Sequence, residues 1–274
     1  MIPLESQNYG SEGRSNRPTL VGVRATNMIS SKNKHLLILG WMGQIGWEGR
    51  LEEPMKRVLE AELMDEAQQA QDYANADFAG VNQAFVERFM TLFPDLVAGV
   101  VADLGCGPGD IPIRLCDALP GITVFGVDGS ADMLGHAREA IAAAGLSPRI
   151  ELLLGRLPLR APPSGPFAAL VSNSLLHHLP DPGVLWAQIN DLADAGTAVL
   201  VVDLLRPETV DEARGIVEKN AFDEPEMLQR DYYNSLLASF TLEEVGAQLA
   251  AAGLCGLQLE TISDRHFAVF GRMG

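Results

Sequence analysis

The chain has 274 residues, of which 47% are hydrophobic, and its 20 basic and 36 acidic side chains give a net charge of −16 at pH 7. This length and composition allow a sizeable core and fit one large domain with an extension. The acidic excess lies outside residues 1–50, and so strongly acidic a body repels nucleic-acid backbones and anionic lipid surfaces. We therefore expect a small-molecule partner, no nucleic acid and no membrane.

The cysteines and the start of the chain favour a cytoplasmic protein. Cys106, Cys116 and Cys255 are widely spaced and show no metal-type pairing, which fits a reducing compartment without disulfides. The apolar stretch 35–47 is too short and too interrupted to span a bilayer, and the polar residues ahead of it are unlike a secretory signal. We expect neither a signal peptide nor an anchor.

The first hundred residues divide into two parts. Residues 1–50 show no sustained hydrophobic period, which predicts a disordered or loosely packed extension and leaves open whether the natural protein includes it. A helical cap is predicted over 51–97, with one helical segment opening at Pro54 and a second amphipathic helix over about 81–93.

From residue 98 to the end, short apolar runs alternate with helical patterns. The runs are VVADL (100–104), ITVFGV (122–127), IELLL (150–154), FAALVS (167–172) and AVLVVDLL (198–205). Strands that are apolar on both faces, with helices between them, are typical of a parallel sheet covered on each side. The last two runs, LQLETI and HFAVFG, are separated only by SDR and must pair as an antiparallel hairpin. The predicted fold is α/β, a Rossmann-like seven-stranded, mostly parallel sheet with helices on both faces.

The stretch DLGCGPGD (103–110) joins the first strand to a helix at the carboxyl edge of this sheet, where open parallel sheets bind ligands. A nicotinamide-binding fingerprint needs a third glycine where this chain has Asp110, so a nicotinamide-dependent oxidoreductase is a weaker alternative. Pyrophosphate would also meet the carboxylates of Asp103 and Asp110. These two acids at the ends of the loop therefore favour a zwitterionic or cationic ligand.

Asp128 ends the next strand, 23 residues after Gly105. A carboxylate at this place can accept hydrogen bonds from both hydroxyls of a ribose. The glycine loop and Asp128 together predict a nucleoside ligand that lacks phosphates.

With these two features, residues 98–271 resemble the class I S-adenosylmethionine-dependent methyltransferases of the small-molecule type. The resemblance implies S-adenosyl-L-methionine as cofactor, released as S-adenosyl-L-homocysteine, with Gly105 and Gly107 lining its methionine part. It also implies that Asp103 anchors the loop and that Asp128 holds the ribose. The expected cofactor-binding residues are Tyr73, Asp103, Gly105, Cys106, Gly107, Asp128, Gly129, Met133, Arg156, Leu157, Asn173 and Ser174.

The chain departs from the family pattern beside the expected adenine site. Many members have an acidic residue after the glycine of the loop that follows the third strand, whereas this chain has Arg156. The backbone of Leu157 is then the expected contact of the adenine edge. Cys106 is interpreted as a small residue that fits the loop, and Tyr73 as either a lid over the cofactor or a core residue.

Candidate acceptor residues follow the fourth and fifth strands. SNSLLHHLPDP (172–182) matches the family's segment toward the acceptor and not its nucleic-acid form. His177, His178 and Asp203 are candidate general bases for a neutral oxygen or nitrogen acceptor, with packing and loop capping as the alternatives. The expected substrate-binding residues are His178, Tyr232, Tyr233 and Asn234, for which ordinary half-buried packing is the alternative.

We expect no metal, because no cluster of histidines and carboxylates has ligand spacing. The predicted function is transfer of a methyl group to a small-molecule acceptor by in-line displacement. A non-catalytic partner protein that binds S-adenosylmethionine is the alternative from another class. The acceptor and the oligomeric state are not indicated by the sequence.

Overall fold

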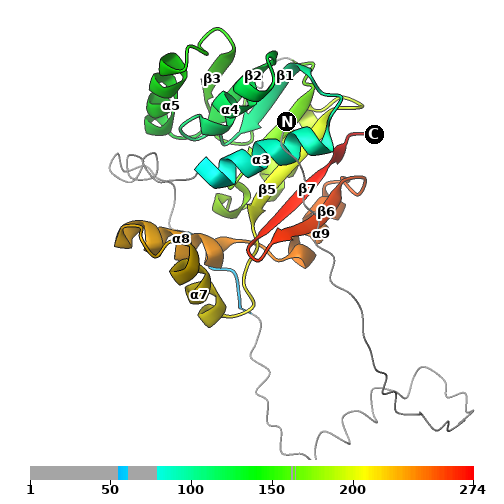
Figure 1. Ribbon diagram of the computed structural model, residues 1–274. Helices are drawn as coiled ribbons and strands as arrows, with labels where there is room; N and C mark the ends of the chain where they lie inside the picture. The colour runs from blue at the N-terminus through cyan, green and yellow to red at the C-terminus, as the bar shows by residue number, and fades with distance from the viewer. Residues whose placement is uncertain (1–54, 61–78, 162, 164) are drawn as a thin grey trace, which may run out of the picture. The chain divides into compact units, whose positions relative to one another are not determined.

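The computed structural model describes residues 55–60, 79–161, 163 and 165–274, which lie in one compact unit, residues 53–274. Within this part of the chain, seven strands form one sheet in the order β3-β2-β1-β4-β5-β7-β6 (Figure 1). The strands are β1 (Ala98–Leu104), β2 (Gly121–Asp128), β3 (Ile150–Leu154), β4 (Ala169–Asn173), β5 (Ala198–Leu204), β6 (Gln258–Ser263) and β7 (His266–Arg272). Strands β1 to β5 are parallel, and β7 runs antiparallel to both β5 and β6. The predicted fold class, including the terminal hairpin, is confirmed.

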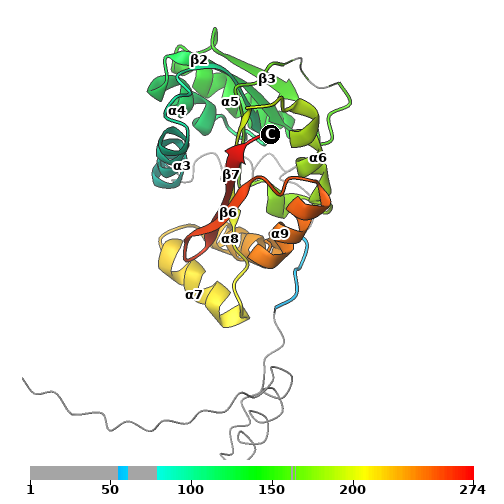
Figure 2. The ribbon, with the colours of Figure 1, turned by 90° about the vertical axis from the view of Figure 1, so that its right-hand side faces the viewer.

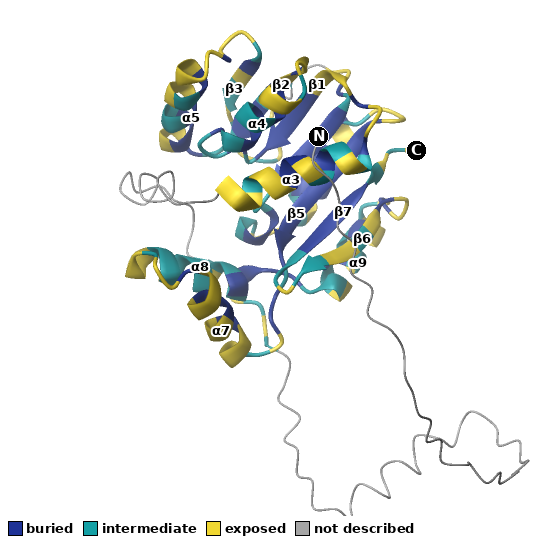
Figure 3. Ribbon diagram, in the orientation of Figure 1, coloured by how far each residue is buried: buried dark blue, intermediate teal, exposed yellow. Residues whose placement is uncertain are grey.

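Helices cover both faces of the sheet (Figure 2). One face packs against α3 (Ala79–Leu92), α4 (Asp110–Ala118) and α5 (Ala131–Ala143), and the other against α6 (Gly183–Leu192) and α9 (Leu242–Ala251). Successive residues of a strand point to opposite faces, so Val101 joins the first core and Ala102 the second. Both faces of the central strands are therefore buried, as Figure 3 shows.

Two further helices, α7 (Val210–Asn220) and α8 (Glu226–Ala238), follow β5 and pack against each other around Ile216 and Leu236. They lie beyond the carboxyl end of β5 (Figure 1). The short helix η1 (Leu176–His178) follows β4 at the same edge. From β1 the chain first adds β2 and β3 on one side of the sheet and then β4 and β5 on the other side of β1. The strand order therefore reverses between β1 and β4, and open parallel sheets bind their ligands at such a reversal.

The described N-terminal residues differ in part from prediction. Helix α3 confirms the amphipathic helix expected near 81–93, but residues 55–60 are not helical, so the helical prediction from Pro54 is wrong for them. Their backbone bonds to distant segments instead, with Val58 N donating to Leu237 O at 3.0 Å. Residues 1–54 and 61–78 lie outside the described part of the chain, and with them the expected extension. Among the described residues, no helix is both long and apolar enough to cross a bilayer.

Candidate functional site

The glycine loop between β1 and α4 has a backbone that side chains would not tolerate. Gly105, Gly107 and Gly109 have φ values of 81°, 51° and 87°, in the left-handed region that favours glycine. The N–H groups of Gly105 and Cys106 both donate to Val127 O, at 2.8 and 2.9 Å, which ties the loop to β2. A Cβ on Gly105 would lie 2.9 Å from the side chain of Leu175, whereas one on Gly107 would meet nothing within 4 Å. The loop therefore leaves open space beside Gly107.

Asp103, the penultimate residue of β1, lies next to this loop as a buried acid, 1% exposed. Within the described residues, neither of its carboxylate oxygens has a hydrogen-bond partner. Burial, and then the nearby Asp128, raise the pKa of Asp103 to about 8. A buried, unpaired carboxylate is costly, and a ligand that brings a positive charge or an N–H donor lowers that cost.

Asp128 ends β2 on the other side of the loop. Its Oδ2 accepts from Gly107 N at 2.9 Å and its Oδ1 from Ser130 N at 2.8 Å, so the carboxylate links the glycine loop to the start of α5. Burial raises the pKa of Asp128 even though these bonds oppose the rise. Each carboxylate oxygen keeps a second lone pair. Asp128 can therefore accept bonds from a ligand while it holds the loop.

The residues expected at the adenine lie together past Asp128. Met133 is buried in the first turn of α5, and a Cβ on Gly129 would lie 3.1 Å from Cγ of Arg156, so the Arg156 stem lies against Gly129. Leu157 is half-buried against the core beneath. Burial raises the pKa of Cys106 well above its usual value, which keeps its thiol protonated and fits a packing role. Tyr73 lies outside the described residues.

The end of β4 meets α3 and α4. Asn173 Nδ2 approaches Asn82 Oδ1 at 3.5 Å, and Asn82 Nδ2 donates to Asp110 Oδ2 at 2.8 Å. Ser174 has φ 54°, the one left-handed non-glycine residue in the described part of the chain, and its N–H donates to Val202 O at 2.9 Å. Such backbone strain is often found at functional sites.

His177 and Asp203 form a buried pair at the ends of β4 and β5. His177 Nδ1 lies 2.6 Å from Asp203 Oδ1, and the side chains are 3% and 1% exposed. Asp203 also accepts from Leu176 N and Leu204 N, each at 2.7 Å. Burial alone would lower the pKa of His177, but the Asp203 carboxylate raises it; His177 in turn lowers the pKa of Asp203 against the effect of burial. This pair fixes η1 and is closed to solvent.

His178 makes a second carboxylate pair that the sequence did not indicate. Its Nδ1 lies 2.6 Å from Glu60 Oε2, with side chains 26% and 17% exposed, and its ring centroid is 4.0 Å from that of His177. Burial would raise the pKa of Glu60, but the hydrogen bond and charge of His178 bring it to about 2. Glu60 is separated from His178 by more than a hundred residues and belongs to a segment with a helical pattern, so no spacing signal pointed to it.

A metal was not expected, yet the side chains near η1 come close together. Among the described residues, Glu60, His177 and His178 each offer a ligand atom, and these atoms lie within 4.8 Å of one another. No other such group of three or more was found in this part of the chain.

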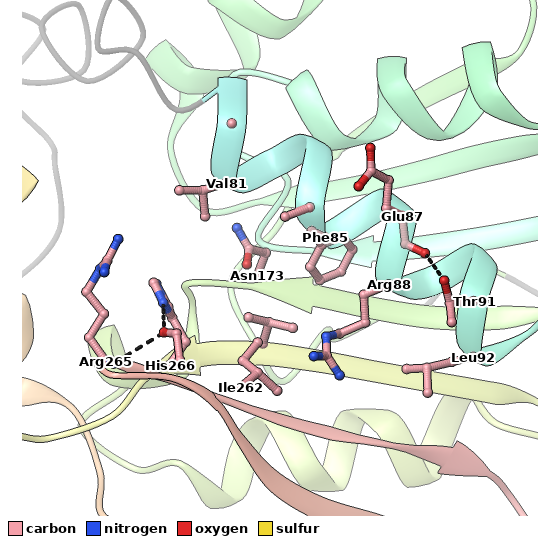
Figure 4. Close-up of a pocket in the computed structure, with 14 residues that line it drawn as sticks. Val81, Phe85, Glu87, Arg88, Thr91, Leu92, Asn173, Ile262, Arg265 and His266 are labelled. Carbon is pink, nitrogen blue, oxygen red and sulfur yellow. Dashed lines mark hydrogen bonds between the residues drawn. The ribbon is translucent and has the colours of Figure 1, made fainter. Parts of the chain in front are cut away.

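A cavity of about 560 Å³ lies between α3 and the ends of β4, β5, β6 and β7 (Figure 4). Most of its exposed lining is apolar, with Asn173, Ser263, Arg265 and His266 at the end near β4 and β7, and Glu87, Arg88 and Thr91 on α3. Burial lowers the pKa of His266 to about 4, so its ring is neutral, with Nδ1 2.9 Å from Ser263 Oγ. The apolar lining residues are Val81, Ala84, Phe85, Leu92, Val202 and Ile262.

The residues predicted to bind the substrate, His178, Tyr232, Tyr233 and Asn234, do not line this cavity. Asn173 lines it directly, and Tyr232 reaches its edge through a hydrogen bond with the lining residue Arg265. Burial raises the pKa of Tyr232 to about 12. Tyr233 packs against the α7–α8 core and Asn234 is exposed on α8, so neither lines this cavity.

Comparisons with known proteins find similarity to methyltransferases. Residues 101–196 match a family model described as a methyltransferase domain. The chain is 37% identical over 140 residues to a trans-aconitate 2-methyltransferase of Rhodopseudomonas palustris (strain HaA2), covering 50% of each chain. It is 37% identical over 94 residues to the release factor glutamine methyltransferase of Gloeobacter violaceus, covering 34% of this chain and 32% of that protein. The chain thus spans half or less of the length of these curated relatives.

Solved structures share the fold. One is a putative S-adenosyl-L-methionine-dependent methyltransferase from Methanococcus maripaludis, with a TM-score of 0.61, 18% identity, and coverage of 79% of this chain and 97% of that one. Another is human N-acetylserotonin methyltransferase in complex with S-adenosylmethionine, with a TM-score of 0.55, 19% identity, and coverage of 76% and 57%.

Proposed function

We propose that the chain carries a class I S-adenosylmethionine-dependent methyltransferase domain and transfers a methyl group to a small-molecule acceptor. The observation that carries the proposal is the edge of the sheet around the glycine loop. It combines open space beside Gly107, the unpaired buried carboxylate of Asp103 and the carboxylate of Asp128. These three features fit a ligand with a cationic amino-acid part and a ribose.

The residues around the loop fit S-adenosylmethionine along its whole length. Backbone at Gly105 and Gly107 would line its methionine part, with Asp103 compensating the positive charge and Asp128 accepting from the ribose hydroxyls. Gly129, Met133 and Leu157 would enclose the adenine, with the Arg156 stem beside them. Once bound, the cofactor supplies a methyl group already activated by a positively charged sulfur. The protein's task is then to align the acceptor and exclude water.

We assign the binding site of the methyl acceptor to the cavity beneath α3. The cavity falls within the usual size range of small-molecule sites, about 300–1,000 Å³, and combines apolar walls with polar groups along α3 and at the end that holds Asn173 and His266. Asn173 lies at that end and also at the end of β4, next to the glycine loop, so the cavity adjoins the proposed cofactor site. Relatives named as trans-aconitate methyltransferases favour a small-molecule acceptor. The net negative charge of the chain disfavours a nucleic-acid acceptor.

The proposed location is the cytoplasm. The three cysteines are free, which supports a reducing compartment.

His177 and Asp203, expected as general bases, act in this proposal as positioning residues, because both are almost completely buried and bonded to each other.

The test is to incubate the protein with methyl-labelled S-adenosylmethionine and a fractionated cell extract. We expect label in one small-molecule fraction, and markedly less of it with Asp128→Ala when the cofactor is kept below saturation. Label that appears only in protein, RNA or lipid would contradict the acceptor class. Absence of any transfer, with tight cofactor binding, would favour a non-catalytic binding protein.

A further inference from the structure

Residues 55–60, here called the strap, are fixed across the edge of the sheet. The Arg57 guanidinium donates to His177 O and Leu179 O, both at 2.9 Å, and to Ala238 O at 2.5 Å. The same group lies 3.9 Å from the centroid of the Phe240 ring. Together with the Val58–Leu237 backbone bond, these contacts tie the strap to both η1 and α8.

This anchoring determines where Glu60 lies. Glu60 is three residues after Arg57, and Arg57 bonds the carbonyl groups on both sides of His178. The 2.6 Å contact between His178 Nδ1 and Glu60 Oε2 is therefore supported by the backbone on both sides of the pair. A Glu60 carboxylate with a pKa of about 2 is ionised at neutral pH. The Glu60 carboxylate is thus a charged hydrogen-bond acceptor that faces Nδ1 of the His178 ring.

The distances in this cluster favour a shared proton over a metal ion. Two ligand atoms, each about 2.1 Å from an ion and at right angles, are about 3 Å apart. His178 Nδ1 and Glu60 Oε2 are closer than that, at a distance of 2.6 Å that fits a short charge-assisted hydrogen bond. His177 already uses its Nδ1 for Asp203. We therefore treat the cluster as two carboxylate–imidazole pairs side by side.

The two pairs differ in their access to a substrate. His177 is almost completely buried, whereas a quarter of the His178 side chain is exposed. Of the two adjacent histidines, His178 is the one open to an acceptor.

We propose that Glu60 positions His178 as the proton acceptor of methyl transfer, and that the atom that attacks the methyl group carries a proton. This inference rests on the proposed function. It identifies the acceptor group as a hydroxyl or an amine or amide N–H. An ionised carboxylate, such as those of trans-aconitate, would need no such base.

The step balances without a further reactant. The acceptor oxygen or nitrogen forms its bond to the methyl carbon while the carbon–sulfur bond breaks and its electron pair stays on sulfur. Glu60 accepts the Nδ1–H bond of His178, which leaves the lone pair on Nε2. The acceptor proton passes to Nε2, and the imidazolium that forms is stabilised by the Glu60 carboxylate.

The test begins without an acceptor. Histidine rings labelled with ¹⁵N report which nitrogen carries the proton when the ring is neutral, in the presence of S-adenosylhomocysteine. We expect His178 to be protonated at Nδ1 in the unchanged protein and in Glu60→Gln, whose amide oxygen still accepts. In Glu60→Ala, the Nε2–H form should appear. An exposed glutamate of α7, changed in Glu218→Gln, serves as the matched control.

The second measurement uses the acceptor found with the extract. We expect Glu60→Ala to lower kcat about 10- to 100-fold and to change the pH profile on its acidic side, with a smaller loss in Glu60→Gln. Affinity for S-adenosylhomocysteine should stay within about threefold. The proposal is overturned if kcat is unchanged, if the ¹⁵N pattern is the same in Glu60→Ala, or if a chelator such as EDTA abolishes activity. If the unchanged protein binds no S-adenosylhomocysteine, the proposed function fails instead.

Discussion

At the scale of single residues, the buried Asp103 and the half-buried Asp128 support the account, and they differ in their hydrogen-bond partners. Asp128 accepts two backbone bonds that hold the glycine loop, whereas Asp103 has no partner among the described residues. A carboxylate buried without a partner reduces stability, so its presence at a ligand-binding edge is best explained by the ligand. The two acids therefore have separable roles, each open to measurement.

Removal of the ribose acid should weaken cofactor binding. We expect Asp128→Ala to lower the affinity for S-adenosylhomocysteine at least about tenfold, because charge-assisted bonds are worth about 1.5–3 kcal/mol each. Calorimetry measures this directly. Asp132→Ala, an exposed acid in the first turn of α5, is the control and should stay within about threefold. Equal affinities for the two variants would place the ribose elsewhere.

Asp103 should make the stability of the cofactor-free protein depend on pH. Its pKa is raised from 3.8 to about 8 in the folded state, so its favourable contribution is complete below about pH 4 and is lost as the pH rises toward 8. Asp103→Asn stays neutral and should therefore gain stability relative to the unchanged protein over that range, while binding the cofactor more weakly. Urea unfolding at a series of pH values measures the difference. A difference that stays constant from pH 4 to 8 would show that Asp103 is ionised in the fold.

At the scale of elements, the glycine loop has two requirements: a left-handed backbone and open space for a ligand. Gly107 is left-handed, and yet a side chain there would meet open space. The strain of a left-handed alanine costs about 1–2 kcal/mol, which the fold tolerates, so the greater effect should fall on whatever occupies that space. A side chain at Gly107 should therefore weaken ligand binding more than it destabilises the fold.

Two glycines with similar conformation allow this to be tested. Gly107→Ala and Gly145→Ala both place alanine in a left-handed conformation with nothing near its Cβ, but Gly145 follows α5 away from the site. We expect similar losses of thermal stability and a loss of S-adenosylhomocysteine affinity of about tenfold or more in Gly107→Ala alone. If both variants keep their affinity, the space beside Gly107 is not the cofactor site.

The sequence predicted elements whose signals are local. Apolar runs bounded by turns identified the strands, and the three residues SDR between two runs required the hairpin, because no longer connection was available. The strap was mispredicted because its apolar spacing resembles a helix, while its conformation depends on bonds to Leu237 and Glu208. Glu60 was missed for the same reason. Contacts between segments so far apart have no signature in a single sequence.

At the scale of the whole molecule, the structure separates the edge that would bind the cofactor from the cavity that would bind the acceptor. The first is built on β1 and β2, the second between α3 and the β5–β7–β6 strands, and Asn173 lies where they meet (Figures 1 and 4). The sequence predicted the first from one motif. The second depends on how α3 lies over the sheet, which the motif does not specify.

Filling the cavity should therefore affect the acceptor alone. Ala84 is exposed on α3 and lines the cavity, so Ala84→Phe should fold, lower turnover at least about tenfold and leave S-adenosylhomocysteine affinity within about threefold. Ala250→Phe, on the exposed side of α9, is the control and should change neither. Unchanged turnover in Ala84→Phe would move the acceptor out of this cavity.

The most direct measurement of the central claim is calorimetric titration of the purified protein with S-adenosylhomocysteine and, separately, with NAD. The account predicts saturable 1:1 binding of S-adenosylhomocysteine, a rise in melting temperature equivalent to about 2.7 kcal/mol at a hundredfold excess over Kd, and no heat with NAD. Binding of NAD without binding of S-adenosylhomocysteine would contradict it.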